Sequence, residues 1–215
     1  MKKLYIYGCS GFGLEVYSHL KDSTILLGDK IYKNVNFCGF IGDKKYIQDD
    51  FLQLCAGDIS ILDNDTMLIL AIGKDMAFKR KIYTMLKDRV AFPTLKHNHA
   101  ITHSKYIGFG NIIAAFVVIS TQSTIGNFNI FHSHSAIGHN TQIKDFNTLS
   151  SFSSMMGYSS LGDGNILGVG ACLLPRACIG DGNIVAPGSY IYKRFRDENR
   201  ISGNPAIATR IETKR

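Results

Sequence analysis

The chain has 215 residues, a formal net charge of +7 and 45% hydrophobic residues, a composition typical of a soluble globular protein of one or two domains. No apolar run approaches the roughly 20 residues needed to cross a bilayer, and Met1-Lys2-Lys3 leads directly into a glycine-rich segment, so we expect no membrane span, no signal peptide and a cytoplasmic protein. The positive charge is better explained by attraction to small polyanions such as nucleotide phosphates, or by a solvated surface, than by a nucleic-acid patch.

The N-terminal part of the chain alternates short apolar runs with glycine turns and amphipathic segments. The predicted elements are strands over residues 4–8, 36–41 and 67–72 and helices over residues 14–21 and 76–87. Strands that alternate with helices favour a small parallel sheet with helices on its faces. We therefore predict a Rossmann-like α/β domain over residues 1–95.

The turn after the first strand carries glycines at positions 8, 11 and 13. The backbone N–H groups and the dipole at the start of the following helix favour an anion there. The spacing departs from G-x-G-x-x-G, and no acidic residue stands where the ribose of NAD would need one. The loop thus favours a phosphate or nucleotide-sugar site over a dinucleotide site, with a simple tight turn as the alternative.

Further candidate residues follow the other two predicted strands, because ligands of parallel sheets bind at the carboxyl ends of the strands. Asp43 could accept hydrogen bonds from a ribose or a base, and Lys44 or Lys74 could meet phosphate. Each of them could equally be a solvated turn residue. The predicted nucleotide-sugar site comprises Gly8, Ser10, Gly11, Asp43, Lys44 and Gly73.

From residue 107 to residue 191 a large apolar residue recurs at every sixth position without a slip. The fifteen residues are Ile107, Ile113, Ile119, Ile125, Phe131, Ile137, Ile143, Leu149, Met155, Leu161, Leu167, Leu173, Ile179, Val185 and Ile191. A period of six fits neither a helix nor a plain strand alternation. It predicts a β-solenoid, in which a short strand is followed by a tight corner and one apolar side chain per edge points inward. We assign residues 96–215 to this solenoid, and three hexads per coil would stack residues 18 positions apart.

Three histidines interrupt this pattern within eight residues: His132, His134 and His139. Neutral imidazoles can bind zinc, but no cysteine or carboxylate lies at a suitable spacing, and the five cysteines of the chain form no C-x-x-C pair. Histidine is also the usual general base for acyl transfer. We therefore expect no metal, and one catalytic histidine among the three.

The hexads and the short α/β domain together resemble the NeuD/PglD family of bacterial sugar acetyltransferases, whose solenoid is a left-handed parallel β-helix. The resemblance covers nearly the whole chain. The matching segments are residues 6–13, 39–43, 72–73 with Arg80, 161–175 and 203–206. The resemblance implies an acetyl-CoA-dependent enzyme of surface-glycan biosynthesis that acts on a nucleotide-linked amino sugar. It also implies a homotrimer with its sites between adjacent prisms.

The resemblance further implies the roles of individual residues. His139 is in register with the family's catalytic base, and Gly157 falls where a backbone N–H meets the thioester carbonyl. Asn140 stands where an acidic residue orients the base, while Thr148 and Phe12 replace histidines found in some members. The coenzyme would contact Gly157, Gly168, Val169, Pro175 and Pro187.

The resulting prediction is an N-acetyltransferase in which His139 acts as the base for direct attack of an amine on acetyl-CoA. O-acetylation of a sugar such as a sialic acid stays open, although a hydroxyl depends more on a strong base and Asn140 argues mildly against it. A non-catalytic nucleotide-sugar-binding solenoid is favoured by Asn140, Thr148 and Phe12. A metal site like that of the γ-carbonic anhydrases would need three zinc-competent histidines across neighbouring subunits.

Overall fold

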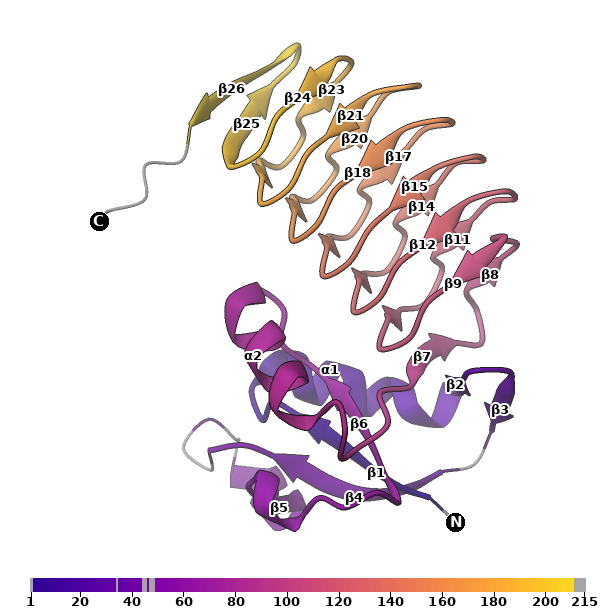
Figure 1. Cartoon of the computed structure of the whole chain (residues 1–215), viewed down its shortest axis with the longest axis vertical. Helices are drawn as coiled ribbons and strands as arrows, with labels where there is room; N and C mark the ends of the chain where they lie inside the picture. Colours follow the sequence, from indigo (N-terminus) through magenta and orange to yellow (C-terminus); the bar gives the residue numbers. More distant parts are fainter. Residues whose placement is uncertain (1, 34, 44–45, 47–48, 211–215) are drawn as a thin grey trace. The chain divides into compact units, whose positions relative to one another are not determined.

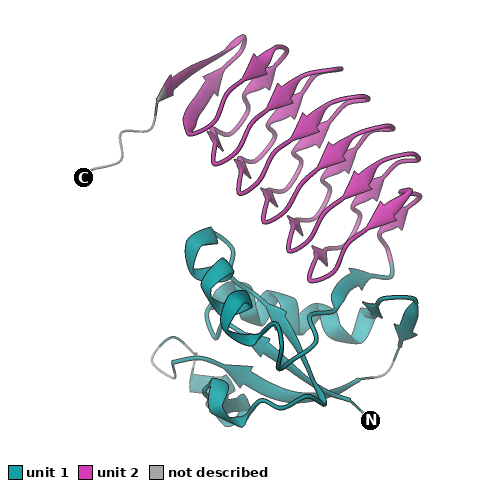
Figure 2. Cartoon of the chain, viewed as in Figure 1, with its two compact units in different colours: residues 1–98 teal, residues 99–215 magenta. Residues whose placement is uncertain are grey.

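The computed structural model describes residues 2–33, 35–43, 46 and 49–210, in two compact units that span residues 1–98 and 99–215 (Figure 2). The boundary expected from the sequence, between residues 95 and 96, falls inside strand β7 (Thr94–His97). Strand β7 pairs antiparallel with β2 (Ser23–Leu27), which belongs to the first unit. This pairing keeps β7 with the first unit.

The first unit contains the small parallel sheet that the sequence predicts, with four strands in the order β5–β4–β1–β6 (Figure 1). Its strands are β1 (Lys3–Tyr7), β4 (Asn36–Ile41), β5 (Cys55–Gly57) and β6 (Thr66–Leu70), and its helices are α1 (Gly11–His19) and α2 (Met76–Leu86). All five residues of β6 are buried, as expected for a parallel strand covered on both faces. Within the described residues, neither of these helices is long and apolar enough to cross a membrane.

A β-hairpin in the first unit was not predicted from the sequence. It joins β2 to β3 (Lys30–Tyr32) in antiparallel register, and its turn passes through Gly28 with a φ of +57°. The described residues of the unit also include the short 3₁₀ helices η1 (Leu20–Asp22), η3 (Asp49–Leu54) and η4 (Ile59–Ile61).

The second unit is a parallel β-helix whose strands stack in three faces (Figure 1). Face I consists of β10 (Ile112–Ile113), β13 (Ile130–Phe131), β16 (Thr148–Leu149), β19 (Ile166–Leu167), β22 (Ile184–Val185) and β25 (Asn199–Gly203), and it ends in the antiparallel strand β26 (Ala206–Arg210). Face II consists of β8 (Ile101–Thr102), β11 (Val118–Ile119), β14 (Ala136–Ile137), β17 (Ser154–Met155), β20 (Cys172–Leu173) and β23 (Tyr190–Ile191). Face III consists of β9 (Tyr106–Ile107), β12 (Thr124–Ile125), β15 (Gln142–Ile143), β18 (Ser160–Leu161), β21 (Cys178–Ile179) and β24 (Arg194–Phe195).

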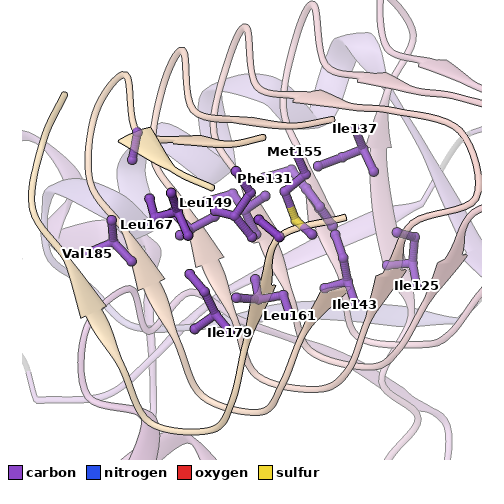
Figure 3. Close-up of a cluster of buried hydrophobic side chains, with 14 of the residues drawn as sticks. Ile125, Phe131, Ile137, Ile143, Leu149, Met155, Leu161, Leu167, Ile179 and Val185 are labelled. Atoms are coloured by element: carbon purple, nitrogen blue, oxygen red, sulfur yellow. The ribbon is translucent and has the colours of Figure 1, made fainter. Parts of the chain in front are cut away.

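The hexad interpretation is confirmed by the core of this unit. Each of the fifteen apolar positions is the second residue of a two-residue strand, and all of them line one continuous core, with only Ile107 partly buried (Figure 3). Most neighbouring strands of a face pair residues 18 apart, as in Ile137 with Met155, so most coils consist of three hexads. The spacing is 17 residues between β8 and β11 and 16 residues between β21 and β24 and between β22 and β25.

A column of buried asparagines runs along the corner between face III and face I. Asn111, Asn129, Asn147, Asn165 and Asn183 are fully buried. The side-chain oxygen of each accepts a hydrogen bond from the backbone N–H of the asparagine on the next coil, at 2.8–2.9 Å, and the series ends at Asn199. Buried polar atoms that are satisfied in this way fix the register between coils.

Candidate functional site

The corner between face II and face III, called here the II–III corner, carries the predicted base. His139 and Asn140 follow β14, and Gly157 follows β17 on the next coil. The backbones of the two turns are joined directly, since the Gly138 N–H donates to the Met155 carbonyl at 2.7 Å and the Tyr158 N–H donates to the His139 carbonyl at 3.1 Å. The 18-residue repeat is thus what places His139 beside Gly157.

The side chain of Asn140 sets the tautomer of the His139 imidazole. The Nδ1 atom of His139 lies 2.9 Å from the Oδ1 atom of Asn140. Because an amide oxygen can only accept, Nδ1 carries the proton and Nε2 keeps its lone pair. Asn140 has a φ of +56°, a conformation that asparagine tolerates better than most residues. The solvent-exposed His139 side chain is therefore oriented as a base by a neutral partner.

Two glycines leave room for the imidazole and for a backbone donor. A Cβ atom at Gly157 would lie 2.8 Å from both Cε1 and Nε2 of His139, so a side chain at this position would displace the ring. A Cβ atom at Gly138 would lie 2.8 Å from the Gly157 nitrogen. The backbone N–H of Gly157 donates no hydrogen bond within the described part of the chain. A basic nitrogen and an uncommitted N–H donor thus lie side by side, as acyl transfer to a nucleophile requires.

Two further residues of this corner were not predicted from the sequence. The ring of Tyr158 meets the His139 imidazole edge-on, with centroids 5.1 Å apart and planes at 89°. The guanidinium carbon of Arg176, one coil farther, lies 5.3 Å from the centroid of the Tyr158 ring. The only sequence signal was a spacing of 18 residues from Asn140 to Tyr158 and from Tyr158 to Arg176, which places all three at one corner.

The residues expected to contact the coenzyme fall on two different corners. Gly157 and Pro175 lie on the II–III corner. Gly168, Val169 and Pro187 lie on the corner between face I and face II, the I–II corner. Gly168 is buried against the next coil, where a Cβ atom would come within 2.5 Å of the Pro187 nitrogen, whereas Val169 is 52% exposed. Gly157 and Pro175 thus lie at one edge of face II. Gly168, Val169 and Pro187 lie at its opposite edge.

The other two histidines singled out in the sequence, His132 and His134, do not lie on the corner of His139. His134 is on the I–II corner, where its ring stacks between Phe116 at 5.0 Å and Phe152 at 4.9 Å. His132 is half-buried at the end of β13. In the described ranges, no group of three or more histidine, cysteine or acidic side chains is placed to hold a metal ion.

A cavity of about 470 Å³ in the first unit gathers most of the predicted nucleotide-sugar residues. It is lined by Tyr7, Gly8, Cys9, Ser10, Phe12, Gly42, Asp43, Tyr46, Ala71, Ile72, Gly73 and Phe78. Of the predicted set, Gly8, Ser10, Asp43 and Gly73 line this cavity, Gly11 does not, and Lys44 is outside the described residues. The sequence analysis missed the aromatic side chains of Tyr7, Tyr46 and Phe78, which come from the end of β1, the turn after β4 and the first turn of α2.

The lining of this cavity can bind a ligand but offers no reactive thiol. Ser10 is the N-cap of α1, so the first-turn N–H groups of the helix begin at the cavity. Burial raises the pKa of the Cys9 thiol to about 11, with smaller contributions from the nearby Cys55 thiol and the Asp43 carboxylate. Cys9 therefore stays protonated near neutral pH, and only the thiolate is a nucleophile.

Nearly the whole chain is similar to solved structures, among them an acetyltransferase domain and a perosamine N-acetyltransferase. The acetyltransferase domain of PglB from Neisseria gonorrhoeae is 21% identical, with a TM-score of 0.82 over 97% of this chain and 100% of that one. PerB from Caulobacter crescentus, solved with CoA and GDP-perosamine, is 21% identical, with a TM-score of 0.81 over 97% of this chain and 98% of that one. WeeI from Acinetobacter baumannii is 20% identical, with a TM-score of 0.79 over 97% of this chain and 100% of that one.

No protein-family model and no curated protein sequence matches the chain significantly. At identities near 20%, the similarity to PglB, PerB and WeeI concerns the fold. It extends over both units of this chain, so the combination of a small α/β unit with a parallel β-helix is shared with these acetyltransferases.

Proposed function

We propose that the chain is an acetyl-CoA-dependent N-acetyltransferase that acts on a nucleotide-linked amino sugar. The observation that carries this proposal is the His139 imidazole, oriented by Asn140 and lying over the backbone of Gly157. The fold supports it, because the similar PerB structure contains CoA and GDP-perosamine. We further propose that the chain belongs to the NeuD/PglD family, that its β-helix is left-handed and that its first unit is Rossmann-like. We also propose that the protein is cytoplasmic.

The reaction follows from the two groups at the II–III corner. The amine nitrogen of the sugar attacks the thioester carbonyl carbon, and Nε2 of His139 takes the proton that this nitrogen loses. The Gly157 N–H donates to the oxygen that gains negative charge, and one such donor contributes about 3–4 kcal/mol in a well-studied protease. The C–S bond then breaks, and the thiolate of CoA takes the proton from the imidazolium.

Asn140 favours an amine over a hydroxyl as the nucleophile. Its amide holds the Nδ1–H tautomer of His139 but cannot neutralise the imidazolium that forms when Nε2 takes a proton. A deprotonated amine is nucleophilic without further activation, whereas a hydroxyl needs a strong base in the transition state. The neutral partner therefore supports N-acetylation.

The cavity of about 470 Å³ in the first unit supports a site for the nucleotide. The N-terminus of α1 at Ser10 and Gly11 suits a phosphate, since its N–H groups and dipole favour negative charge. Asp43 can accept hydrogen bonds from a ribose or a base, and the ring of Tyr7 or Phe78 offers a flat apolar wall. Gly8 and Gly73 line the same cavity, where the lack of a side chain at Gly8 lets the Ala71 backbone approach. Lys44 remains a proposed phosphate contact.

The split of the coenzyme residues between two corners supports a homotrimer. If the II–III corner of one prism faces the I–II corner of the next, Gly157 and Pro175 of one chain meet Gly168, Val169 and Pro187 of another across one bound coenzyme. Exposed apolar side chains on face II, such as Ile101 and Val118, suit burial in such an assembly.

The test of the function is His139→Ala in an assay for CoA thiol release with amino-sugar nucleotides. We expect turnover at saturating acceptor to fall by at least about a hundredfold, the lower range for loss of a general base. His19→Ala is the matched control, because it removes an imidazole at the end of α1, outside the cavity lining and outside both corners of the proposed site, and its turnover should stay close to that of the unaltered protein. Undiminished turnover of His139→Ala would remove this residue from the mechanism. Binding of acetyl-CoA without thiol release for any amino sugar would instead indicate a non-catalytic binder.

A further inference from the structure

Tyr158 and Arg176 occupy backbone positions that usually suit glycine or asparagine. Both have a φ of +64°, in the left-handed region where a Cβ atom crowds the following carbonyl oxygen. Bulky side chains take the same conformation at other corners, as at Phe116 and Phe152, with φ values of +61° and +60°. The backbone conformation therefore does not distinguish Tyr158, whereas its contacts do.

The contacts of Tyr158 point to its role. Its ring meets the His139 imidazole edge-on at 5.1 Å, an arrangement in which the positive ring edge faces the negative ring face. Its ring also lies 5.3 Å from the guanidinium carbon of Arg176, a cation–π contact. Backbone bonds maintain this order along the corner, because the Tyr158 N–H donates to the His139 carbonyl and the Arg176 N–H donates to the Gly157 carbonyl.

The imidazole of His139 needs a second support because Asn140 holds only one atom of the ring. The hydrogen bond to Nδ1 restrains that edge of the ring, whereas the opposite edge, which carries Nε2, makes no hydrogen bond in the described part of the chain. Gly157 offers no side chain against which the ring could rest. In the described part of the chain, Tyr158 is the aromatic neighbour of this imidazole.

We propose that Tyr158 is a positioning residue that fixes the plane of the His139 imidazole over Gly157, and that Arg176 holds Tyr158 in place. This inference rests on the acetyl-transfer function proposed above. Tyr158 acts through His139 and contacts no reacting atom. A small misplacement of a catalytic group lowers the turnover number more than it changes substrate binding, which separates this role from a binding role.

The test uses Tyr158→Gly, Tyr158→Phe and Arg176→Gly. Glycine suits the left-handed conformation, so both glycine variants should fold with a thermal midpoint no lower than that of the unaltered protein. We expect Tyr158→Gly to lower kcat about tenfold to a hundredfold with little change in KM. Tyr158→Phe keeps the ring and should restore kcat to within about twofold, and Arg176→Gly should show a smaller, few-fold loss.

The matched control is Glu198→Gly, which also replaces an exposed side chain with a left-handed backbone, with a φ of +56°, and lies between face III and face I, outside both corners of the proposed site. It should leave kcat unchanged. A kcat of Tyr158→Gly equal to that of the unaltered protein, or an equal loss in Glu198→Gly, would overturn the proposal.

A crystal structure of Tyr158→Gly gives a readout that needs no substrate. If the His139 ring has left its position over Gly157, the positioning role is supported even if the unaltered protein acetylates no amino sugar and the proposed function fails. If the ring stays in place, the positioning role is wrong whatever the activity.

Discussion

The imidazole of His139 lies so close to the backbone of Gly157 that any side chain at position 157 would collide with it. The two residues are 18 positions apart, one coil of the β-helix, and the turn of each is hydrogen-bonded to the other through the Tyr158 N–H. This contact brings together the only two groups that the proposed chemistry needs, a proton acceptor and an N–H donor.

Gly157→Ala should therefore strongly lower activity without unfolding the protein. Position 157 does not have a left-handed backbone, so alanine is tolerated there, but its methyl group displaces the imidazole. We expect kcat to fall by about a hundredfold, as for other small misplacements of catalytic groups. Gly138→Ala is the contrasting variant, because its Cβ atom meets backbone atoms at 2.8–3.0 Å and should lower the thermal midpoint. Full activity of Gly157→Ala would show that the His139 imidazole does not act as the base from its present position.

Asn140→Asp should raise the turnover number. A carboxylate at this position still accepts from Nδ1 of His139 and, unlike the amide, stabilises the imidazolium. We expect kcat to rise several-fold, up to about tenfold, since about 1.4 kcal/mol of transition-state stabilisation corresponds to a factor of ten. Asn140→Gly, which suits the φ of +56°, should lower kcat because the tautomer is no longer held. Steady-state kinetics at saturating substrate measures both effects, and an unchanged kcat in both variants would contradict the role of Asn140.

Two inactive variants should restore activity when they are co-expressed, if the coenzyme site lies between chains. His139→Ala removes the base from the II–III corner, and Val169→Glu places a charge on the proposed coenzyme surface of the I–II corner. In randomly mixed trimers, about one quarter of the sites combine two intact corners, so we expect about a quarter of full activity. Sedimentation of the unaltered protein should show a trimer. A mixture with no activity, or a fully active monomer, would contradict the shared site.

Nucleotides should raise the thermal midpoint through the cavity of the first unit. A ligand that binds only the folded state stabilises it, so a screen of UDP, dTDP, GDP and CoA identifies the preferred nucleotide. Asp43→Asn should weaken the nucleotide-induced shift, and the shift caused by CoA should stay the same. Asp29→Asn is the control, because Asp29 is an exposed aspartate in the turn of the β2–β3 hairpin and lies outside the cavity lining. Equal nucleotide shifts in both variants would exclude Asp43 from the site.

Stability should also depend on pH through Lys79. Complete burial lowers the pKa of this lysine from 10.5 to about 7 in the folded protein. Between pH 7 and pH 10 the unfolded chain binds a proton at Lys79 that the folded chain does not, so its contribution to stability rises with pH, by about 1.4 kcal/mol per unit. Below pH 7 both the folded and the unfolded chain bind the proton, so this pH-dependent contribution of Lys79 to the free energy of unfolding is absent.

Lys79→Met isolates this effect because it keeps a long side chain and removes the ionisable group. The difference in the free energy of unfolding between Lys79→Met and the unaltered protein should be largest near pH 7 and shrink toward pH 10. Chemical denaturation at several pH values measures it. A difference that stays constant with pH would show that Lys79 does not titrate in this range.

The solenoid could be predicted from the sequence because an apolar residue recurs at every sixth position along its coils. The apolar residue at each sixth position has to point inward in a three-sided coil, and the same period placed His139 and Gly157 on one corner. The column of asparagines carried an equally regular signal, at positions 111, 129, 147, 165 and 183, that the sequence analysis did not use.

The remaining features depend on contacts that a local pattern does not contain. Helix α1 begins at Gly11, three residues earlier than predicted, because Gly13 packs against the Gly8 carbonyl and acts as a helix residue. The β2–β3 hairpin was missed although Gly28-Asp29 between two apolar runs is a usual turn signal. The Tyr158 contact could not be foreseen, because an aromatic residue with a left-handed backbone contradicts local preference.

The asparagine column has a consequence for how such a protein can change in length. Each coil presents the same acceptor to the coil after it, so a segment of 18 residues carrying one asparagine could be inserted or deleted with every later corner kept in line. A segment that does not close a coil would break a buried hydrogen bond and rotate the corners against one another, whereas the 16-residue coil from Asn183 to Asn199 still closes and keeps the bond. The distance between His139 and the C-terminal end of the β-helix can therefore change only by whole coils.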